Sequence, residues 1–215
     1  MSIIGFAGIE KYDVIISLAL ILRKLEKKVA IYDLSESKAI CYTVPYGLEP
    51  GAADLKGADV FSDASTLADN AAAYDYVLID FGFDVHNEAI ALCKEIYVVT
   101  DFQMQHYKRL LELRLGDKQA RYLVLRYTDV NKHLQNSIIS EFSRLYVTQN
   151  NTFRLDSYLE DSLRMLVLQH EGIIRFKKIP EEMRFFLMTI LADTVEEPLL
   201  KGAVKALQRE SLIRI

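Results

Sequence analysis

The sequence contains little glycine, proline or cysteine. Among its 215 residues are 9 glycines, 4 prolines and 2 cysteines. Sparse glycine and proline, 51% hydrophobic residues and the lack of any low-complexity tract argue against extended disorder. The length suits one α/β domain over residues 1–215, because two domains of ordinary size would not fit comfortably.

Signals for metal binding and for membrane spans are also missing. Cys41 and Cys93 lie far apart in the sequence, and the four histidines show no metal-ligand spacing. The longest mainly apolar run, Val14 to Leu22, is about nine residues, whereas a membrane span needs roughly 20. No signal-peptide pattern is present. These absences predict a cytoplasmic, reduced protein without structural zinc, which would contact the inner face of a membrane only peripherally.

No excess of positive charge draws the chain toward polyanions. The net charge of −4 gives no general attraction to nucleic acid or anionic lipid, so no nucleic-acid partner is expected. A local exception is the amphipathic segment 198–215. It could form a membrane-surface or partner-binding helix, or the solvated face of a core-packed helix, which the pattern favours. Its cationic face holds Lys201, Lys205 and Arg209, and its apolar face holds Leu200, Val204 and Leu207.

Strand and helix patterns alternate along the chain. Continuous apolar runs that end in turn residues predict strands that are buried on both faces. The segments between them predict helices, including Asn87–Lys94 and Gln103–Leu115. This alternation predicts an α/β fold with three layers and a doubly wound, mostly parallel sheet of about seven strands. The predicted strands are a first one from Ile3, then Lys28–Asp33, Ile40–Val44, Ala58–Phe61, Tyr76–Asp80, Glu95–Asp101, Arg121–Tyr127 and Gly172–Phe176.

The connection between the first strand and the first helix holds the most specific signal. A phosphate-binding loop needs glycine amides, a lysine for the phosphate oxygens and a Ser or Thr hydroxyl for Mg²⁺. Of these types, only Gly8 and Lys11 are present. Glu10 places an anion beside the lysine, and Tyr12 stands where the small hydroxyl residue would be. Asp13 could bind a cation and the N-terminus of the helix favours an anion, so weak nucleotide binding stays open, whereas efficient hydrolysis is not expected.

Three polar side chains are expected at one edge of the predicted sheet. Lys11 follows the first strand, Asp33 ends the second, and Asp80 ends the Tyr76 strand. In a doubly wound sheet, these strand ends share one crevice. An alternative stays open for each residue: Lys11 could be an exposed lysine at a helix start, and Asp33 and Asp80 could cap the loops that follow them.

With these residues in this order, nearly the whole chain resembles the MinD/ParA family of deviant Walker-A ATPases, a family with a P-loop NTPase fold. The loop Phe6–Lys11 stands at the family's lysine-glycine-glycine-x-glycine-lysine motif, with Lys11 at the Walker lysine. The strand ending at Asp80 is similar to the Walker-B strand, and Asp33 matches the aspartate of the second strand. The family's further acidic residue is Ser35 here.

The resemblance implies ATP or ADP with Mg²⁺ as cofactor, and Asp33 and Asp80 as metal ligands. It also implies protein partners and a homodimer, but Phe6 stands at the family's signature lysine, which reaches across the dimer. Arg126–Tyr127 stands where an asparagine contacts adenine, and Ile179–Glu182 resembles a loop near the base. The residues implied to bind the cofactor are Gly8, Lys11, Tyr12, Asp13, Asp33 and Asp80.

Three functional hypotheses follow. The leading one is a non-hydrolysing or weakly active scaffold or localisation factor for a membrane-associated assembly, such as a pilus or secretion system, which rests on the resemblance alone. The second is an active Mg²⁺-dependent ATPase with an atypical P-loop that uses Lys11, Asp33 and Asp80. The third, a receiver-like module whose acidic crevice binds a cation, is disfavoured because the first strand ends without paired acids.

Overall fold

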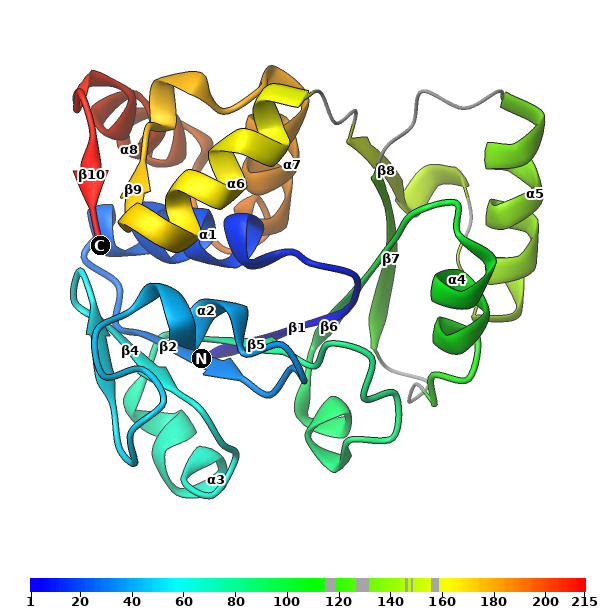
Figure 1. Cartoon of the computed structure of the whole chain (residues 1–215), viewed down its shortest axis with the longest axis horizontal. Coiled ribbons are helices and arrows are strands. Elements are labelled where there is room, and N and C mark those ends of the chain that lie inside the picture. Colours follow the sequence, from blue (N-terminus) through cyan, green and yellow to red (C-terminus); the bar gives the residue numbers. More distant parts are fainter. Residues whose placement is uncertain (115–118, 127–131, 146, 148, 156–158) are drawn as a thin grey trace.

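An eight-stranded sheet forms the centre of the protein (Figure 1). The computed structural model describes residues 1–114, 119–126, 132–145, 147, 149–155 and 159–215. The strands follow the spatial order β3-β4-β2-β5-β1-β6-β7-β8, and only the β3–β4 pair is antiparallel. They are β1 (Ser2–Gly8), β2 (Val29–Asp33), β3 (Ala53–Leu55), β4 (Ala58–Phe61), β5 (Tyr76–Asp80), β6 (Glu95–Thr100), β7 (Ala120–Arg126) and β8 (Thr152–Leu155).

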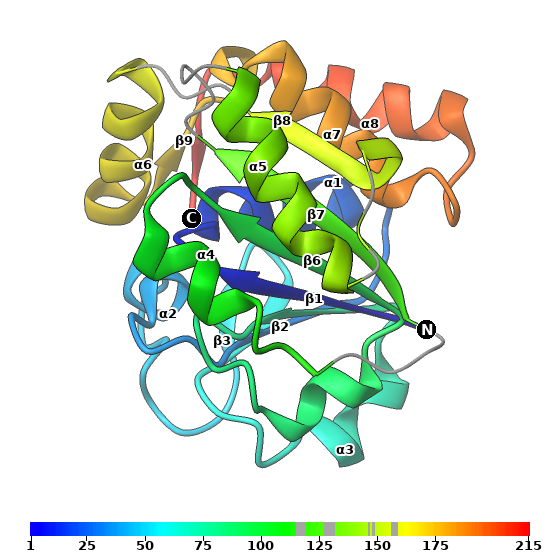
Figure 2. The same cartoon turned by 90° about the vertical axis from the view of Figure 1, so that its right-hand side faces the viewer.

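Helices cover both faces of this sheet and complete three layers (Figures 1 and 2). One face packs against α1 (Tyr12–Lys24), α2 (Ala39–Thr43), α6 (Leu159–Glu171), α7 (Glu181–Leu191) and α8 (Glu197–Arg209). The other packs against α3 (Leu67–Asn70), the 3₁₀ turn η2 (Glu88–Leu92), α4 (Met104–Leu110) and α5 (Lys132–Phe142). A small antiparallel sheet pairs β9 (Ile173–Ile174) with β10 (Ile213–Arg214) near the C-terminus. The remaining 3₁₀ turns are η1 (Ala71–Ala73), η3 (Ser143–Leu145), η4 (Gln149–Asn151) and η5 (Phe176–Lys178).

The sequence of β1 shows why the sheet has a core on each side. Successive side chains of a strand point to opposite faces. Ile4 and Phe6 therefore pack toward α1, whereas Ile3 and Ala7 pack toward the opposite layer. Because β5 and β6 flank β1, all of its residues are buried, which explains why the strand has no charged residue and only one polar residue, Ser2.

A row of aromatic rings crosses the sheet beneath α7. Phe6 stacks on Tyr97 with 5.4 Å between ring centroids, and Tyr97 stacks on Tyr122 at 4.7 Å. Phe153 continues the row from β8, and Phe186 of α7 contacts both Tyr97 and Phe153. Offset-stacked and edge-to-face ring pairs stabilise a core beyond the area they bury. This row therefore ties four neighbouring strands to one helix.

The predicted architecture is confirmed: the fold is α/β, three-layered and mostly parallel, with eight strands in the main sheet rather than about seven. The prediction of a strand at Ile40–Val44 is wrong, because this segment forms helix α2. The β-branched and aromatic residues there favoured a strand, but the Asp33 carboxylate accepts hydrogen bonds from the amides of Ile40 and Cys41 and so organises a helical turn.

Other element boundaries also differ from expectation. The strands β3 and β8 were not predicted, because each has at most four residues, too few for a clear periodic pattern. The predicted strand Gly172–Phe176 is reduced to β9, and the Asn87–Lys94 helix is the 3₁₀ turn η2. The helix predicted over Gln103–Leu115 is shorter in the structure, where α4 spans Met104–Leu110. Leu115, like Tyr127 of the predicted seventh strand, lies outside the described residues.

The C-terminal helix α8 is packed into the core. Its apolar side, formed by Leu200, Val204 and Leu207, is buried and belongs to the core on the α1 face. Lys201, Lys205 and Arg209 are exposed on the outer side. The core-packed interpretation of this segment therefore describes the structure. Among the described residues, no helix combines the length and the apolar composition that crossing a membrane requires.

Candidate functional site

The connection between β1 and α1 is short. β1 ends at Gly8 and α1 begins at Tyr12, so only Ile9, Glu10 and Lys11 join them. The loop predicted to begin at Phe6 is wrong, because Phe6 pairs within the sheet with β5 and β6. A phosphate-binding loop of the GxxxxGK[ST] type supplies consecutive amides over roughly eight residues. Here the amide of Gly8 donates to the carbonyl of Gly82 at 2.5 Å, and that of Ile9 donates to Val99 at 3.0 Å.

Gly8 is required by the backbone at this turn. Its φ is +114°, a conformation that residues with a side chain rarely adopt. A Cβ at this position would also lie 1.9 Å from the carbonyl oxygen of Val99. The close passage of β1 past β6 therefore accounts for the glycine without reference to a ligand.

Lys11 is buried and bonded within the protein. Its side chain is 1% exposed, and its Nζ lies 2.6 Å from Oδ1 of Asp80. The same Nζ donates to the carbonyl oxygens of Gly8 at 3.0 Å and Ile9 at 3.3 Å. The ammonium therefore has an ion-pair partner and two carbonyl acceptors. The alternative of an exposed lysine at the helix start is wrong.

Asp33 caps helix α2 instead of pointing freely into the crevice. It is fully buried at the end of β2, directly opposite Asp80 in the β2–β5 register. Its Oδ1 accepts hydrogen bonds from the amide and hydroxyl of Ser35, and its Oδ2 accepts from the amides of Ile40 and Cys41. Both carboxylate oxygens are therefore occupied by protein donors. Lys38 closes the same loop by donating to the carbonyl of Asp33.

Tyr12 and Asp13 face away from Asp80, toward α6 and β7. The hydroxyl of Tyr12 donates to the carbonyl of Met165 at 2.9 Å. Asp13 and Arg126 form a buried bidentate pair with two N–O distances of 3.0 Å. Arg126 also donates to the carbonyl of Glu10 and so holds the 9–11 connection. Sequence reasoning missed this role of Arg126, whose signal is a basic residue at the end of a buried strand.

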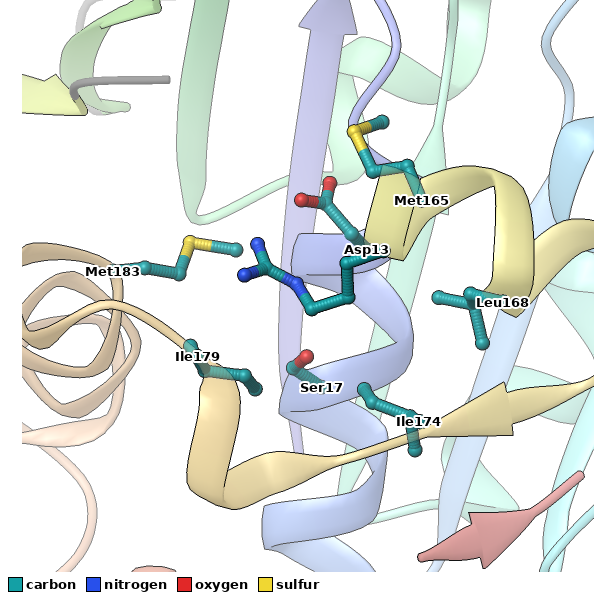
Figure 3. A pocket seen from close by; sticks show the side chains of 8 residues that line it. Asp13, Ser17, Met165, Leu168, Ile174, Ile179 and Met183 are labelled. Atoms are coloured by element: carbon teal, nitrogen blue, oxygen red, sulfur yellow. The ribbon is translucent and has the colours of Figure 1, made fainter. Parts of the chain in front are cut away.

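Figure 3 shows what surrounds the first two turns of α1. Asp13 and Ser17 border a cavity of about 10 Å³, enough space for roughly one water molecule. The cavity is otherwise mainly apolar. Its further lining residues are Arg164, Met165, Leu168, Ile174, Ile179 and Met183. Ile179 therefore lines this small cavity beside α1. It belongs to the run Ile179–Glu182, which resembles a family loop near the nucleotide base.

The described donors do not fit Mg²⁺ in this arrangement. Mg²⁺ needs carboxylate oxygens that are free to coordinate it at near-ideal octahedral geometry. Asp33 has no oxygen free of hydrogen bonds, and Asp80 Oδ1 is shared by Lys11 and the amide of Gly82. Within the described ranges, no group of three His, Cys, Asp or Glu side chains is placed to hold a metal ion. Coordination by Asp33, or by Oδ1 of Asp80, would have to break existing bonds.

Negative charge is concentrated around Lys11. Burial raises the pKa of the Asp80 carboxyl, the nearby Lys11 ammonium opposes that rise, and Asp33 adds to it. Desolvation likewise raises the pKa of Glu10, and a hydrogen bond with Ser37 opposes it. The Lys11 ammonium is thus paired with Asp80, and Asp33 and Glu10 add further acidic groups nearby. These acidic groups would repel an anionic ligand.

A second polar cluster lies beyond β6 and was also missed from the sequence. Nδ1 of His106 lies 2.9 and 3.0 Å from the two oxygens of Asp101. Arg109 stacks over the ring of Phe83 at 4.5 Å and lies 3.6 Å from Glu36. The spacing of Asp101, His106 and Arg109 along one helical turn and its start is the signal that could have indicated it. These contacts join the loops after β2, β5 and β6.

Comparison with known proteins gives a consistent answer on architecture. No protein-family model matches the chain, and no curated protein matches its sequence. Among solved structures, a chain of the MinC:MinD cell division protein complex of Aquifex aeolicus is 13% identical, with a TM-score of 0.54 over 97% of this chain and 95% of that chain. The chain has a MinD/ParA-like fold.

Two further structures support this likeness. A putative plasmid partition protein of Borrelia burgdorferi B31, bound to AMPPNP, is 12% identical with a TM-score of 0.53, and the match covers 96% of this chain and 97% of that chain. Apo McdA of Cyanthece is 10% identical with a TM-score of 0.53, over 96% and 99%. The structural similarity over nearly the whole chain establishes the MinD/ParA-like fold. At identities this low, it does not transfer the role of any residue to this chain.

Proposed function

We propose that this MinD/ParA-like protein is a scaffold or localisation factor that works without efficient nucleotide hydrolysis. One observation carries the proposal: the lysine at the Walker position is buried and is bonded to Asp80 and to two backbone carbonyls. A phosphate would have to separate this pair in a site of low dielectric, where breaking a buried ion pair is costly. The three-residue connection adds few free amides in return.

The experiment is calorimetric titration of ATP and ADP, with and without Mg²⁺. We expect no saturable heat up to millimolar nucleotide. Lys11→Met, combined with Asp80→Asn to avoid an unpaired buried charge, serves as the matched variant and should give the same flat titration. Micromolar binding by the parent that disappears in the double variant would overturn the proposal.

The second candidate is an active Mg²⁺-dependent ATPase with an atypical P-loop. It is favoured by the convergence of Lys11, Asp33 and Asp80 at adjoining strand ends, and by the structural neighbour that binds AMPPNP. It predicts Mg²⁺-dependent phosphate release that Asp80→Asn abolishes. Phosphate release at the same background rate in parent and variant would exclude it.

The partners of the scaffold are part of the same proposal. The MinC:MinD neighbour is a protein complex, which supports a protein partner for this chain. We retain the homodimer and the link to a membrane-associated assembly, such as a pilus or secretion system, as predictions. The expectation of no nucleic-acid partner is not retained, because one structural neighbour is pNOB8 ParA bound to nonspecific DNA, at 11% identity and a TM-score of 0.50. Since the apolar side of α8 is already buried, membrane contact through α8 would depend on Lys201, Lys205 and Arg209.

A further inference from the structure

Helix α6 carries apolar side chains on two sides. Met165 and Leu168 are buried against the core on the α1 face. Leu163, Leu166 and Val167 are 53%, 51% and 37% exposed. A surface helix normally has one apolar stripe, which faces its own core. The second apolar side of α6 therefore has no partner within the described part of the chain.

Part of this second side forms the wall of a groove between α6 and β9. The α6–β9 groove has a volume of about 460 Å³. Leu163 and Val167 contribute its apolar wall, with Ile173 of β9. The lining residues are Leu163, Arg164, Val167, Glu171, Ile173, Arg175 and Lys178.

The groove is positively charged although the chain is net negative. Its charged lining residues are three cations and one acid, Glu171. Arg175 and Lys178 are exposed, and neither makes an ion pair with any residue of the ranges that the structure describes. Some exposed lysines elsewhere are paired, as in Lys201–Glu197 at 2.5 Å, and others, such as Lys205, have no ion-pair partner among the described residues. The unpaired cations beside apolar side chains complement a ligand that is both acidic and apolar.

We propose that the α6–β9 groove binds an amphipathic helix of a partner protein, with acidic residues beside its apolar stripe. A partner helix places apolar anchors at i, i+3 or i+4, and i+7, and the groove offers Leu163 and Val167, one turn apart on α6, for packing against them. Carboxylates at the edge of that stripe would meet Arg175 and Lys178. The hollow between α6 and β9 favours a helix, which can enter it, over a membrane surface, which is too broad to do so.

This inference rests on the proposed scaffold role and names the chemistry of its partner. The test is selection from a phage-displayed library of helical peptides, with the full-length protein as bait and Leu163→Asp as counter-bait. We expect enriched peptides to share an apolar i, i+3 or i+4, i+7 stripe with flanking Asp or Glu. By fluorescence anisotropy, Leu163→Asp and the pair Arg175→Glu with Lys178→Glu should each weaken their binding about tenfold.

The matched controls lie on α8. Leu199 is 57% exposed and Lys205 is also exposed, so Leu199→Asp and Lys205→Glu make the same kinds of change outside the groove and should leave binding within about twofold. Circular dichroism melting checks that every variant folds. The proposal is overturned if no enriched peptide depends on Leu163, if the peptides are basic, or if Leu199→Asp weakens binding equally.

A membrane is the competing occupant, and vesicles distinguish it. Sedimentation with vesicles of phosphatidylglycerol and phosphatidylcholine should be unaffected by Leu163→Asp. Leu163-dependent sedimentation without peptide binding would overturn the proposal in favour of a lipid surface. Nucleotide titration is a separate readout: Lys11-dependent ATP binding would overturn the scaffold role, whereas a failed peptide selection would overturn only the groove assignment.

Discussion

At the scale of single residues, the Lys11–Asp80 pair decides how the candidate site behaves. Both side chains are almost completely buried, and their charged atoms lie 2.6 Å apart. Removing one member of a buried pair leaves an uncompensated charge, whereas replacing both members can be nearly neutral. The pair is therefore expected to act as a structural unit of the fold.

The first prediction concerns this pair. Asp80→Asn should lower the free energy of unfolding by ~3 kcal/mol, because the Lys11 ammonium loses its buried counter-charge. Adding Lys11→Met to that variant should recover most of the loss. Urea unfolding measures both. The control is Lys24→Ala in the exposed Lys24–Glu210 pair, at 2.9 Å, which should cost less than ~1 kcal/mol. Equal costs at both sites would contradict the prediction.

The second prediction concerns Glu95, a buried acid at the start of β6. Burial raises its pKa, although the hydroxyl of Tyr97 donates to it at 2.9 Å and opposes the rise. The folded protein therefore keeps this proton at pH values where the unfolded chain has released it. Stability should fall as pH rises from the ordinary pKa of 4.5 through the raised value, because the folded state binds more protons there.

Glu95→Gln removes this dependence while it keeps an acceptor for Tyr97. The variant should be more stable than the parent at pH 7 by ~1 kcal/mol, and the difference should shrink toward pH 4. Urea unfolding across this pH range measures it. A variant that is less stable than the parent at pH 7 would show that the ionised Glu95 is well solvated or paired.

At the scale of elements, Asp33 shows how one side chain can determine a local structure. Its carboxylate accepts four hydrogen bonds from the loop and from the start of α2. Asp33→Ala should therefore lower the free energy of unfolding by ~2–3 kcal/mol, and Mg²⁺ should not change the stability of the parent. Chemical unfolding with and without Mg²⁺ measures both effects.

Asp63 provides the matched control for this third prediction. It also accepts a hydrogen bond from a backbone amide two residues later, but it is exposed. Asp63→Ala should cost less than ~0.5 kcal/mol, since surface substitutions are usually small. Mg²⁺-dependent stabilisation of the parent that disappears in Asp33→Ala would assign Asp33 to a metal instead of to α2.

The same element shows what sequence alone could and could not predict. Buried strands such as Tyr76–Asp80 have continuous apolar runs, so the layers and the sheet were predictable. The helical structure of residues 39–43 depends on hydrogen bonds to the carboxylate of Asp33, which lies at least six residues earlier. The local propensities of residues 39–43 contain no information about this contact. The partners of Lys11 and Asp13 depend on the length of the β1–α1 connection, and the motif pattern suggested a longer loop.

At the scale of the whole molecule, the MinD/ParA-like fold and the proposed scaffold role lead to a prediction about assembly. If the protein forms a homodimer whose interface does not depend on bound nucleotide, ATP should not change the mass of the assembly in solution. Sedimentation velocity should give twice the mass of the chain with and without Mg²⁺-ATP. The Lys11→Met, Asp80→Asn double variant should behave identically. Dimerisation that appears only with Mg²⁺-ATP would point to a retained nucleotide switch.

Phe6 limits how this protein can change over evolutionary time. Its ring is 0% exposed and stacks on Tyr97 inside the aromatic row. A lysine introduced there would place an ammonium among aromatic rings in the core, where an unpaired charge is strongly disfavoured. A lysine at this position could leave the core only if an insertion first lengthened the connection between β1 and α1. A single substitution therefore cannot place a lysine at this position at low cost, and several coordinated changes would be needed.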